Sequence, residues 1–378
     1  MKTATPLQQE TVSSGLNVRQ LINRYSTLIA LAVLFIIANF VSEYFVQPQN
    51  LTNITLQIAV NGILAVGMTM VILTGGIDLG VGSVVGLTGV VLGMTQGYGV
   101  VPAILATLAT GIIIGLWNAL FISRFNIPPF IVTLGMMTIA RGFALYLSNG
   151  AAVSLNENKF YEQLGTGFLS VNLSAVLLGL IALFVAFVGF KAMRQKSFNL
   201  ESVISFVLSL AGIGLFSWAY LSYQGVPYLV LVFAVIVLWG IWVLTQTTFG
   251  RYLYAIGGNA KAAYLSGVNV KKNLVKVYVT SSVLAAIAGI IMTTRVGSAD
   301  PNGGNMFELD AVAAAVIGGT SLAGGFGTIG GAMIGAFIIG ILNNILILAN
   351  VNPYFQFIFK GLIIIAAVLL DMKNKQQK

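Results

Sequence analysis

The sequence contains no cysteine and no histidine. Disulfides, thiolate nucleophiles, histidine general bases and Cys or His zinc ligands are therefore excluded. Charge is scarce as well, because Asp, Glu, Lys and Arg together make up 8% of the 378 residues, whereas a typical soluble domain carries about 25%. A chain this poor in charge cannot cover a water-facing surface, and a lipid bilayer is the solvent that fits it.

Long apolar runs stand where the charges are missing, since 57% of the residues are hydrophobic. A helix needs about 20 apolar residues to cross the bilayer core, so we predict an all-α polytopic membrane protein with about twelve transmembrane helices. The tenth span is short and could be a re-entrant segment instead. The expected spans are 27–46, 53–73, 80–96, 101–123, 130–149, 172–190, 202–223, 228–245, 274–293, 309–322, 328–348 and 353–371.

The few charges are mostly positive, giving a formal net charge of +9. They lie between apolar runs, so they predict membrane topology rather than nucleic-acid binding. An even number of spans puts both termini on one side, and 15 of the 19 Lys and Arg residues fall on that side. The positive-inside rule makes that side cytoplasmic. We therefore expect cytoplasmic ends at 1–26 and 372–378 and a transmembrane domain at 27–371.

An internal repeat relates residues 111–130 (GIIIGLWNALFISRFNIPPF) to residues 336–355 (AFIIGILNNILILANVNPYF) at a constant offset of 225. Apolar segments share Ile by chance, but matched Gly, Asn and Pro are harder to obtain that way. The two copies would cross the membrane in opposite senses, as inverted repeats of transporters do. We predict halves at 53–149 and 274–371, with the two spans of 172–223 inserted between them.

Polar residues inside spans are costly, so each is a candidate for function. For Asp78 the alternatives are a cap on the third span and a substrate role. Arg141 could extend outward to the interface, pair with a carboxylate or touch substrate, and Lys360 is expected to have an internal partner. Asn118 and Asn343 could hydrogen-bond across helices or line a pathway. The full set is Asp78, Asn118, Arg141, Asn343, Asn344 and Lys360.

The longest cytoplasmic connection, about 246–273, predicts an isolated two-turn helix. Gly257-Gly258 should break the preceding structure, Asn259 is a good N-cap, and Gly267 fits the position after the helix end. One interpretation is an ordinary surface helix. The other is a coupling helix that docks into a cytoplasmic partner, with Ala262, Ala263 and Ser266 as a small face that permits close approach.

This loop resembles the ATPase-facing loop of ABC-type sugar import permeases of the ribose/xylose/galactose class. The matching positions include Gly250, Arg251, Gly257, Gly258, Asn259, Ala262, Ala263 and Gly267. Further similar motifs follow in order along the chain: GGIDLGVGSVVGL (75–87), NIPPFIVTLGMM (126–137), FELDAVAAAVIGGTSLAGGFGTIGG (307–331) and the run at 357–371. The two inserted spans and the overall length are most similar to the xylose-system permease.

The resemblance implies a homodimeric permease in the bacterial cytoplasmic membrane that imports a monosaccharide. A cytoplasmic ABC ATPase would bind ATP and magnesium, and a periplasmic sugar-binding protein would deliver the substrate. The chain itself has no G-x-x-x-x-G-K-[ST] phosphate loop, so we expect it to be no enzyme and to bind no cofactor or metal. The glycines of 318–331 are expected to permit close helix packing or a tight turn.

The outer loop carries three acidic candidates for contact with the binding protein, Asp300, Glu308 and Asp310. For Glu308 and Asp310 the alternative is a cap on the tenth span. The alternative function is a self-contained, ion-coupled secondary sugar transporter. Such a protein needs a titratable or oxygen-rich ion site near the midplane. The ionisable groups expected there are only the cations Arg141 and Lys360, which argues against it.

Overall fold

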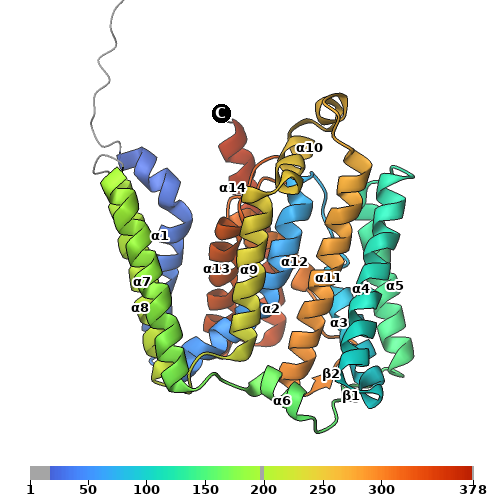
Figure 1. The fold of residues 1–378 in the computed structure, drawn as a ribbon, viewed down its shortest axis with the longest axis horizontal. Helices are drawn as coiled ribbons and strands as arrows, with labels where there is room; N and C mark the ends of the chain where they lie inside the picture. The colour runs from blue at the N-terminus through green and yellow to red at the C-terminus, as the bar shows by residue number, and fades with distance from the viewer. Residues whose placement is uncertain (1–17, 196–199, 377–378) are drawn as a thin grey trace, which may run out of the picture.

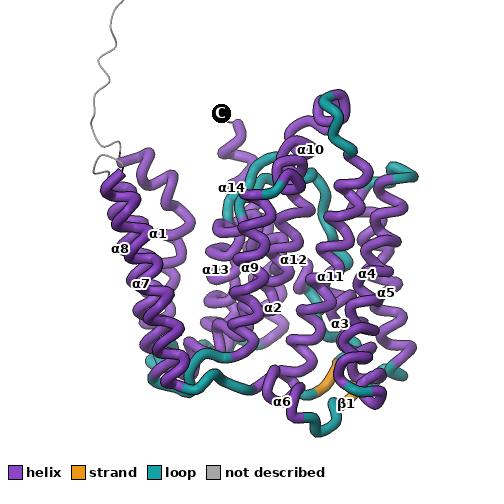
Figure 2. Tube along the Cα trace, viewed as in Figure 1, coloured by secondary structure: helices purple, strands orange, loops and turns teal. Residues whose placement is uncertain are grey.

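The computed structural model describes residues 18–195 and 200–376, and almost all of this part is helical (Figure 2). The helices run side by side between the two ends of a bundle (Figure 1). In chain order they are α1 (Val18–Val41), α2 (Pro48–Leu73), α3 (Val81–Thr95), the 3-10 helix η1 (Gln96–Tyr98), α4 (Val100–Ser123), α5 (Pro129–Leu147), α6 (Lys159–Thr166), α7 (Val171–Gln195), α8 (Leu200–Leu221), α9 (Tyr228–Gln246), α10 (Thr248–Leu265), α11 (Val270–Val296), α12 (Phe307–Ile317), α13 (Ile329–Leu348) and α14 (Pro353–Gln376).

The two ends of the bundle differ. At one end lies α10, and at the other lie α6 and a two-stranded antiparallel pair, β1 (Val153–Ser154) with β2 (Ser298–Ala299) (Figure 1). The start of α1 and the end of α14 lie at the α10 end. Of the predicted chain ends, 1–17 and 377–378 lie outside the described residues, while 18–26 and 372–376 belong to α1 and α14.

Seven of the described helices are long and apolar enough to cross a membrane, judged by length and composition. This confirms the predicted class of a helical polytopic membrane protein. Each predicted span overlaps a helix, but the number of twelve crossings stays a prediction. The seven are α2, α4, α5, α7, α9, α11 and α13.

Two of the predicted spans coincide with helices that are short for a crossing. α3 has 15 residues and α12 has 11, so they are about 22 and 16 Å long, against a hydrocarbon core of about 30 Å. Each follows a stretch of non-helical backbone, 74–80 before α3 and 300–306 before α12. These stretches of turns and irregular backbone lie next to the short helices inside the bundle.

The chain around α12 joins the two ends of the bundle. It leaves β2 at one end and arrives at Gly325, whose amide donates a 2.9 Å hydrogen bond to the carbonyl of Leu73 beside α10. The structure therefore does not have the alternative in which 309–322 turns back to the side it came from.

The centre of the bundle is formed by α2 and α11, whose apolar windows are 83% and 61% buried. α11 packs against α2, α3 and α4. The contact with α4 depends on a small residue, because a Cβ on Gly115 would lie 2.6 Å from the Cα of Val279. The inserted helix α7 is the opposite case, with 6% of its window buried, and it lies with α8 and α1 at the edge of the bundle (Figure 1).

We predict that Gly115→Val separates α4 from α11 and lowers stability, because overpacking a close contact costs about 1–3 kcal/mol. Gly135→Val is the matched control, since a Cβ on Gly135 meets no atom within 4 Å. The measurement is the thermal unfolding midpoint of each purified variant in detergent. Equal midpoints for the two variants would contradict the packing described here.

Candidate functional site

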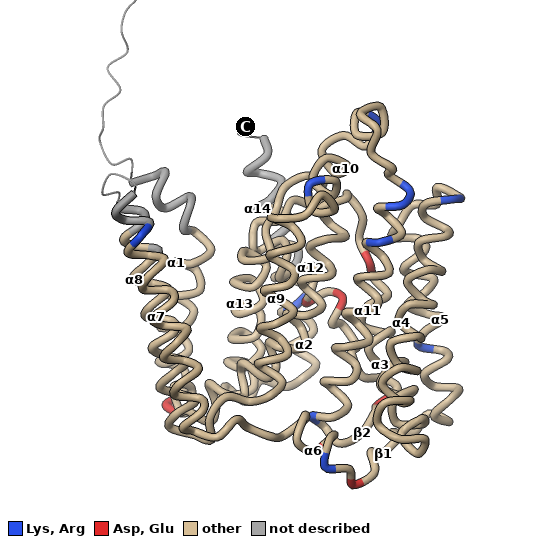
Figure 3. The backbone as a smooth tube through the Cα atoms, viewed as in Figure 1, with Lys and Arg blue, Asp and Glu red and all other residues tan. Residues whose placement is uncertain are grey.

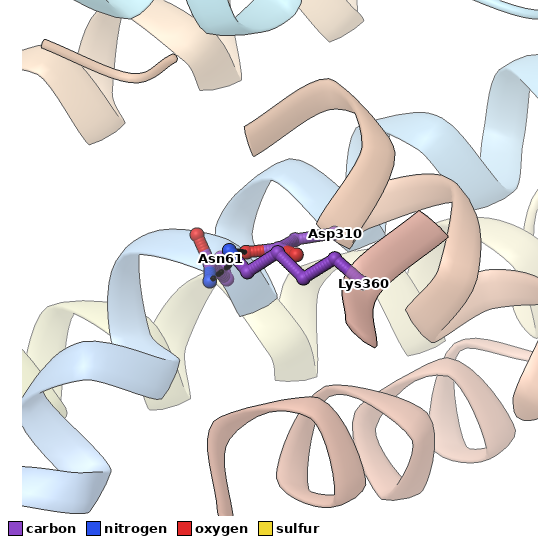
Figure 4. Close-up of polar contacts among 3 residues, drawn as sticks. All are labelled: Asn61, Asp310 and Lys360. Carbon is purple, nitrogen blue, oxygen red and sulfur yellow. Dashed lines mark hydrogen bonds and ion pairs between the residues drawn. The ribbon is translucent and has the colours of Figure 1, made fainter. Parts of the chain in front are cut away.

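A buried ion pair joins α12, which overlaps the uncertain tenth span, to α14. The Nζ atom of Lys360 in α14 lies 2.9 Å from Oδ2 of Asp310 in α12 (Figure 4). The side chains are 16% and 3% exposed, respectively. The expected internal partner of Lys360 is therefore Asp310. A charge pair at this depth has to be well satisfied, because desolvation of both charges offsets much of their attraction.

Two amide side chains complete the surroundings of Asp310. The Nδ2 atom of Asn61 in α2 donates to the same carboxylate oxygen at 3.3 Å (Figure 4), and the side chain of Asn343 in α13 also hydrogen-bonds to Asp310. The carboxylate is thus shared by groups from α2, α13 and α14. Oδ1 of Asn61 is buried and has no partner among the described residues, so this polar site retains an acceptor that is not used internally.

The three acidic candidates of the outer loop have different positions. Glu308 and Asp310 lie in the first turn of α12 and are buried. No side-chain hydrogen bond caps this helix, and a contact of these two residues with a partner protein stays a prediction, for which their burial leaves little exposed surface. Asp300 is exposed, and its Oδ1 accepts a hydrogen bond from the amide of Asn302 at 2.8 Å. Asp300 is therefore the most accessible of the three for a contact outside the chain.

Arg141 stabilises the non-helical segment before α12. Its guanidinium, on α5, donates hydrogen bonds to the carbonyl oxygens of Pro301 and Gly303, and Glu308 and Asp300 attract its charge. None of the three predicted roles describes this contact, because the main partners are backbone carbonyls. The segment can approach α3 closely since Gly82 and Gly86 face it, and a Cβ at Gly86 would lie 2.8 Å from the carbonyl oxygen of Gly303.

Asp78 plays a similar part in the non-helical segment before α3. Its Oδ2 accepts from the hydroxyl of Ser281 in α11 at 2.9 Å, and its Oδ1 accepts from the amide of Gly80 at 3.1 Å. Gly80 is the residue before α3, which has no side-chain cap. Asp78 therefore fixes the turn that leads into the helix rather than capping its first turn.

The two asparagines at corresponding positions of the repeat, Asn118 and Asn343, have different surroundings. Asn343 bonds to Asp310 across helices, whereas both side-chain polar atoms of Asn118 are buried without a partner among the described residues. Asn344 pairs with Asn50 of α2 through two amide hydrogen bonds, of 3.1 and 2.9 Å. Asn343 and Asn344 thus have structural partners, and Asn118 does not.

The predicted short helix is the second part of α10. The helix is interrupted at Asn259, whose φ and ψ are −161° and 98°, and Oδ1 of Asn259 accepts from the amide of Ala262 at 2.9 Å. Gly267 has φ of 87° just after the end. The cap and the terminator are as predicted. The break comes one residue later than Gly257-Gly258, and the residues before it, from Thr248, are helical rather than loop.

The exposed face of this short helix agrees with the predicted one at Ala262 and Ser266 but not at Ala263. Ala263 is 6% exposed and packs with Ile256 and Val268, so it cannot meet a partner. The large side chains Tyr264 and Leu265 are 69% and 76% exposed instead. A hydrophobic pair that projects from a short, fixed helix is suited to insertion into a groove of another protein.

Backbone contacts attach α10 to the bundle. A Cβ on Gly257 would lie 1.8 Å from the carbonyl oxygen of Leu73 and 2.4 Å from the amide of Gly325, so only glycine fits. The hydroxyl of Tyr254 donates to the carbonyl of Gly327 at 2.8 Å, and burial raises the pKa of Tyr254. We call Leu73, Gly257 and Gly325 the glycine junction. It links α10 to the end of α2 and to the turn between α12 and α13.

The glycines of 318–331 have both expected roles. Gly319, Gly324 and Gly325 have φ values of 89°, 85° and 74° in the turn, a left-handed region that favours glycine. Gly331 packs directly against the carbonyl of Gly318. Within the described residues, no group of three or more Asp or Glu side chains is arranged to hold a metal ion.

Comparison with known proteins identifies the family. The chain matches the family model described as "branched-chain amino acid transport system / permease component" over residues 50–368. The chain belongs to this permease family. Membership makes it a permease component rather than an enzyme. No solved structure matches the chain.

Several curated members of this permease family are similar over most of their length. The xylose transport system permease protein of Escherichia coli K12 is 38% identical over 349 residues, covering 88% of this chain and 87% of the relative. The corresponding protein of Haemophilus influenzae is 38% identical and covers 93% and 97%. The ribose import permease protein of Escherichia coli K12 is 40% identical and covers 93% and 94%.

We predict that Lys360→Met destabilises the protein by about 3–5 kcal/mol, because it leaves the Asp310 carboxylate buried without its cation. The double variant Lys360→Met, Asp310→Asn should recover most of this loss, since no uncompensated charge remains. Lys159→Met, at an exposed position on α6, is the control. The measurement is thermal and denaturant unfolding in detergent, and a double variant no more stable than Lys360→Met would refute the pairing.

Proposed function

We propose that this chain is the membrane-spanning permease subunit of an ABC-type monosaccharide importer, for D-xylose or a related sugar. The observation that carries the proposal is the attachment of α10. An exposed, capped helix is joined by the glycine junction to α2 and to the turn after α12, so a force on α10 reaches both partly helical crossings. The curated relatives named for xylose and ribose transport support a sugar as the substrate.

The proposed topology has twelve crossings in the bacterial cytoplasmic membrane, with both termini and α10 in the cytoplasm. Most Lys and Arg residues drawn in Figure 3 lie at the α10 end, and the positive-inside rule assigns such an end to the cytoplasm. Lys2, Lys196 and Lys378 lie outside the described residues.

The two halves are proposed to be an inverted repeat. Adding 225 to the bounds of α2, α3, α4 and α5 gives, within four residues, the bounds of α11, α12, α13 and α14. α2 runs toward α10, whereas α11 runs away from it. The partly helical crossings, α3 and α12, then correspond to each other, and alternating exposure of a central site can result from motion of one half against the other.

The partners follow from this function. Two copies of the chain would form the pathway, a cytoplasmic ATPase with its ATP and magnesium would bind the α10 end, and a periplasmic sugar-binding protein would bind the opposite end. Arg251, Gly258, Asn259, Ala262 and Gly267 stay assigned to contact with the ATPase. Gly250 and Gly257 act inside the chain, since a Cβ on Gly250 would also meet backbone, 2.4 Å from the carbonyl of Val243.

The alternative, an ion-coupled secondary transporter, needs a different argument than the sequence suggested. The structure adds carboxylates to the ionisable groups inside the bundle, because Asp310 and Asp78 are buried there. Both are engaged, however, by Lys360 and by Ser281. The attachment of α10 and the family relatives favour the ATPase-driven function.

We predict that Gly258→Trp abolishes sugar uptake and ATPase co-purification while membrane insertion is unchanged. A Cβ on Gly258 meets no atom within 4 Å, so the indole projects outward and blocks docking without disturbing the bundle. Gly97→Trp is the matched control, at an equally open glycine of η1 at the other end. Normal uptake by Gly258→Trp would refute the coupling role of α10.

A further measurement distinguishes the ATPase-driven importer from the ion-coupled secondary transporter. We expect no uptake by vesicles that contain this chain alone under a proton gradient, and ATP-dependent uptake once the ATPase and binding protein that co-purify from native membranes are added. Uptake by the chain alone would establish the secondary transporter. The ligand of the co-purified binding protein identifies the sugar.

A further inference from the structure

A groove lies between α4 and α11 near the α10 end of the bundle. Its volume is about 470 Å³, and it is lined by Leu116, Leu120, Ser123, Arg124, Lys271 and Val275. The two helices are in closest contact further along, where Gly111 and Gly115 face Ser282 and Val279. The groove is therefore the space left where two tightly crossed helices separate.

The deeper wall of the groove is apolar and faces outward. Leu116 and Leu120 lie one turn apart on α4 and are 49% and 45% exposed, and Val275 of α11 lies opposite them. Both helices are candidate spans. This wall consequently lies at the depth of the lipid acyl chains.

The mouth of the groove is cationic. Arg124 directly follows the last residue of α4, and Lys271 is the second residue of α11. Both are exposed, and within the described residues neither forms an ion pair. The carboxylate that contacts α11 further along, Asp78, is buried and accepts a hydrogen bond from Ser281. Because the two cations stand at the ends of spans, they lie at the level of the lipid head groups.

We propose that this groove binds one anionic phospholipid from the leaflet on the α10 side. Its phosphate lies between Arg124 and Lys271, and one acyl chain follows Leu116, Leu120 and Val275. The groove has two cations at its mouth and an apolar wall below them. An anionic lipid is complementary to this arrangement, with a negative head group followed by an apolar tail. The lipid would fill the space at the start of α11. This start, Val270, comes three residues after Gly267, which ends the turn that follows α10.

The experiment measures lipid binding to the delipidated protein in detergent by native mass spectrometry. The probes are phosphatidylglycerol and phosphatidylcholine with identical acyl chains. We expect phosphatidylglycerol to bind roughly thirtyfold more tightly at one site, as two basic side chains near a lipid phosphate provide. Arg124→Gln with Lys271→Gln should remove this preference. Lys261→Gln with Lys272→Gln removes the same charge from the same end outside the groove and should keep it.

A second pair of variants tests the apolar wall separately. Leu120→Trp fills the groove without changing charge and should weaken phosphatidylglycerol binding about tenfold, as loss of well over one kcal/mol of acyl-chain contact would. Leu105→Trp, at another exposed position of α4 that is 59% exposed, should not. Glycerol phosphate should not compete, because it lacks the chain.

Two results would overturn the proposal. The first is equal binding of the two lipids by the unaltered protein. The second is an unchanged preference in the Arg124→Gln, Lys271→Gln variant. If that variant also loses ATPase binding or self-association, the groove is a protein interface instead. Thermal unfolding of each variant in detergent verifies that it is folded.

Discussion

Two stretches of non-helical backbone inside the bundle, 74–80 and 300–306, set the constraint on which the rest of the structure depends. Backbone polar groups cannot face lipid without partners, so such stretches must be enclosed by protein. α2 and α11, the most buried of the long helices, provide that enclosure. The glycine face of α3 serves the same purpose, because Gly82 and Gly86 admit the carbonyls of 303 and 304 at close range.

The buried charged residues serve the same two stretches. Asp78 and Ser281 fix the first, Arg141 fixes the second through its carbonyls, and the Asp310–Lys360 pair ties the helix that follows the second to α14. Each charge is costly in an apolar interior, and Asp78 and Arg141 contact the stretches where the backbone has lost helical hydrogen bonds. These polar groups therefore lie beside backbone that is already non-helical. A conformational change there would break fewer helical hydrogen bonds than a change inside a helix.

The sequence predicts the helical bundle well, since long apolar runs leave little choice of structure in lipid. It also predicts the Asn259 cap and the Gly267 terminator, because capping is a local interaction. It does not predict which groups meet across helices. Asn61, Asn50 and Ser281 are missed as partners, although Asn61, a lone amide within an apolar run, carries a signal of its own. The sequence places Glu308 and Asp310 at an exposed loop. Their burial depends on how the non-helical stretch before α12 packs against other helices, which no local pattern shows.

The same limit explains Ala263. Its small size indicates an open docking face, but small residues also fill tight contacts, and only the fold of the hairpin against Ile256 and Val268 distinguishes the two. In the same way, the partner of Lys360 lies 50 residues away in the chain, and no local pattern identifies it. Long-range pairing is the part of this structure that the sequence leaves undetermined.

The glycine junction has a consequence for how such proteins can diverge. Its contacts are made by the main chain, through Leu73, Gly257 and Gly325, while Tyr264 and Leu265 project from the far side of the same hairpin. In the proposed coupling role, side chains would recognise the partner and the backbone would transmit the movement. Exposed side chains of the hairpin are free to change with each partner during evolution, and the mechanical connection beneath them persists unaltered.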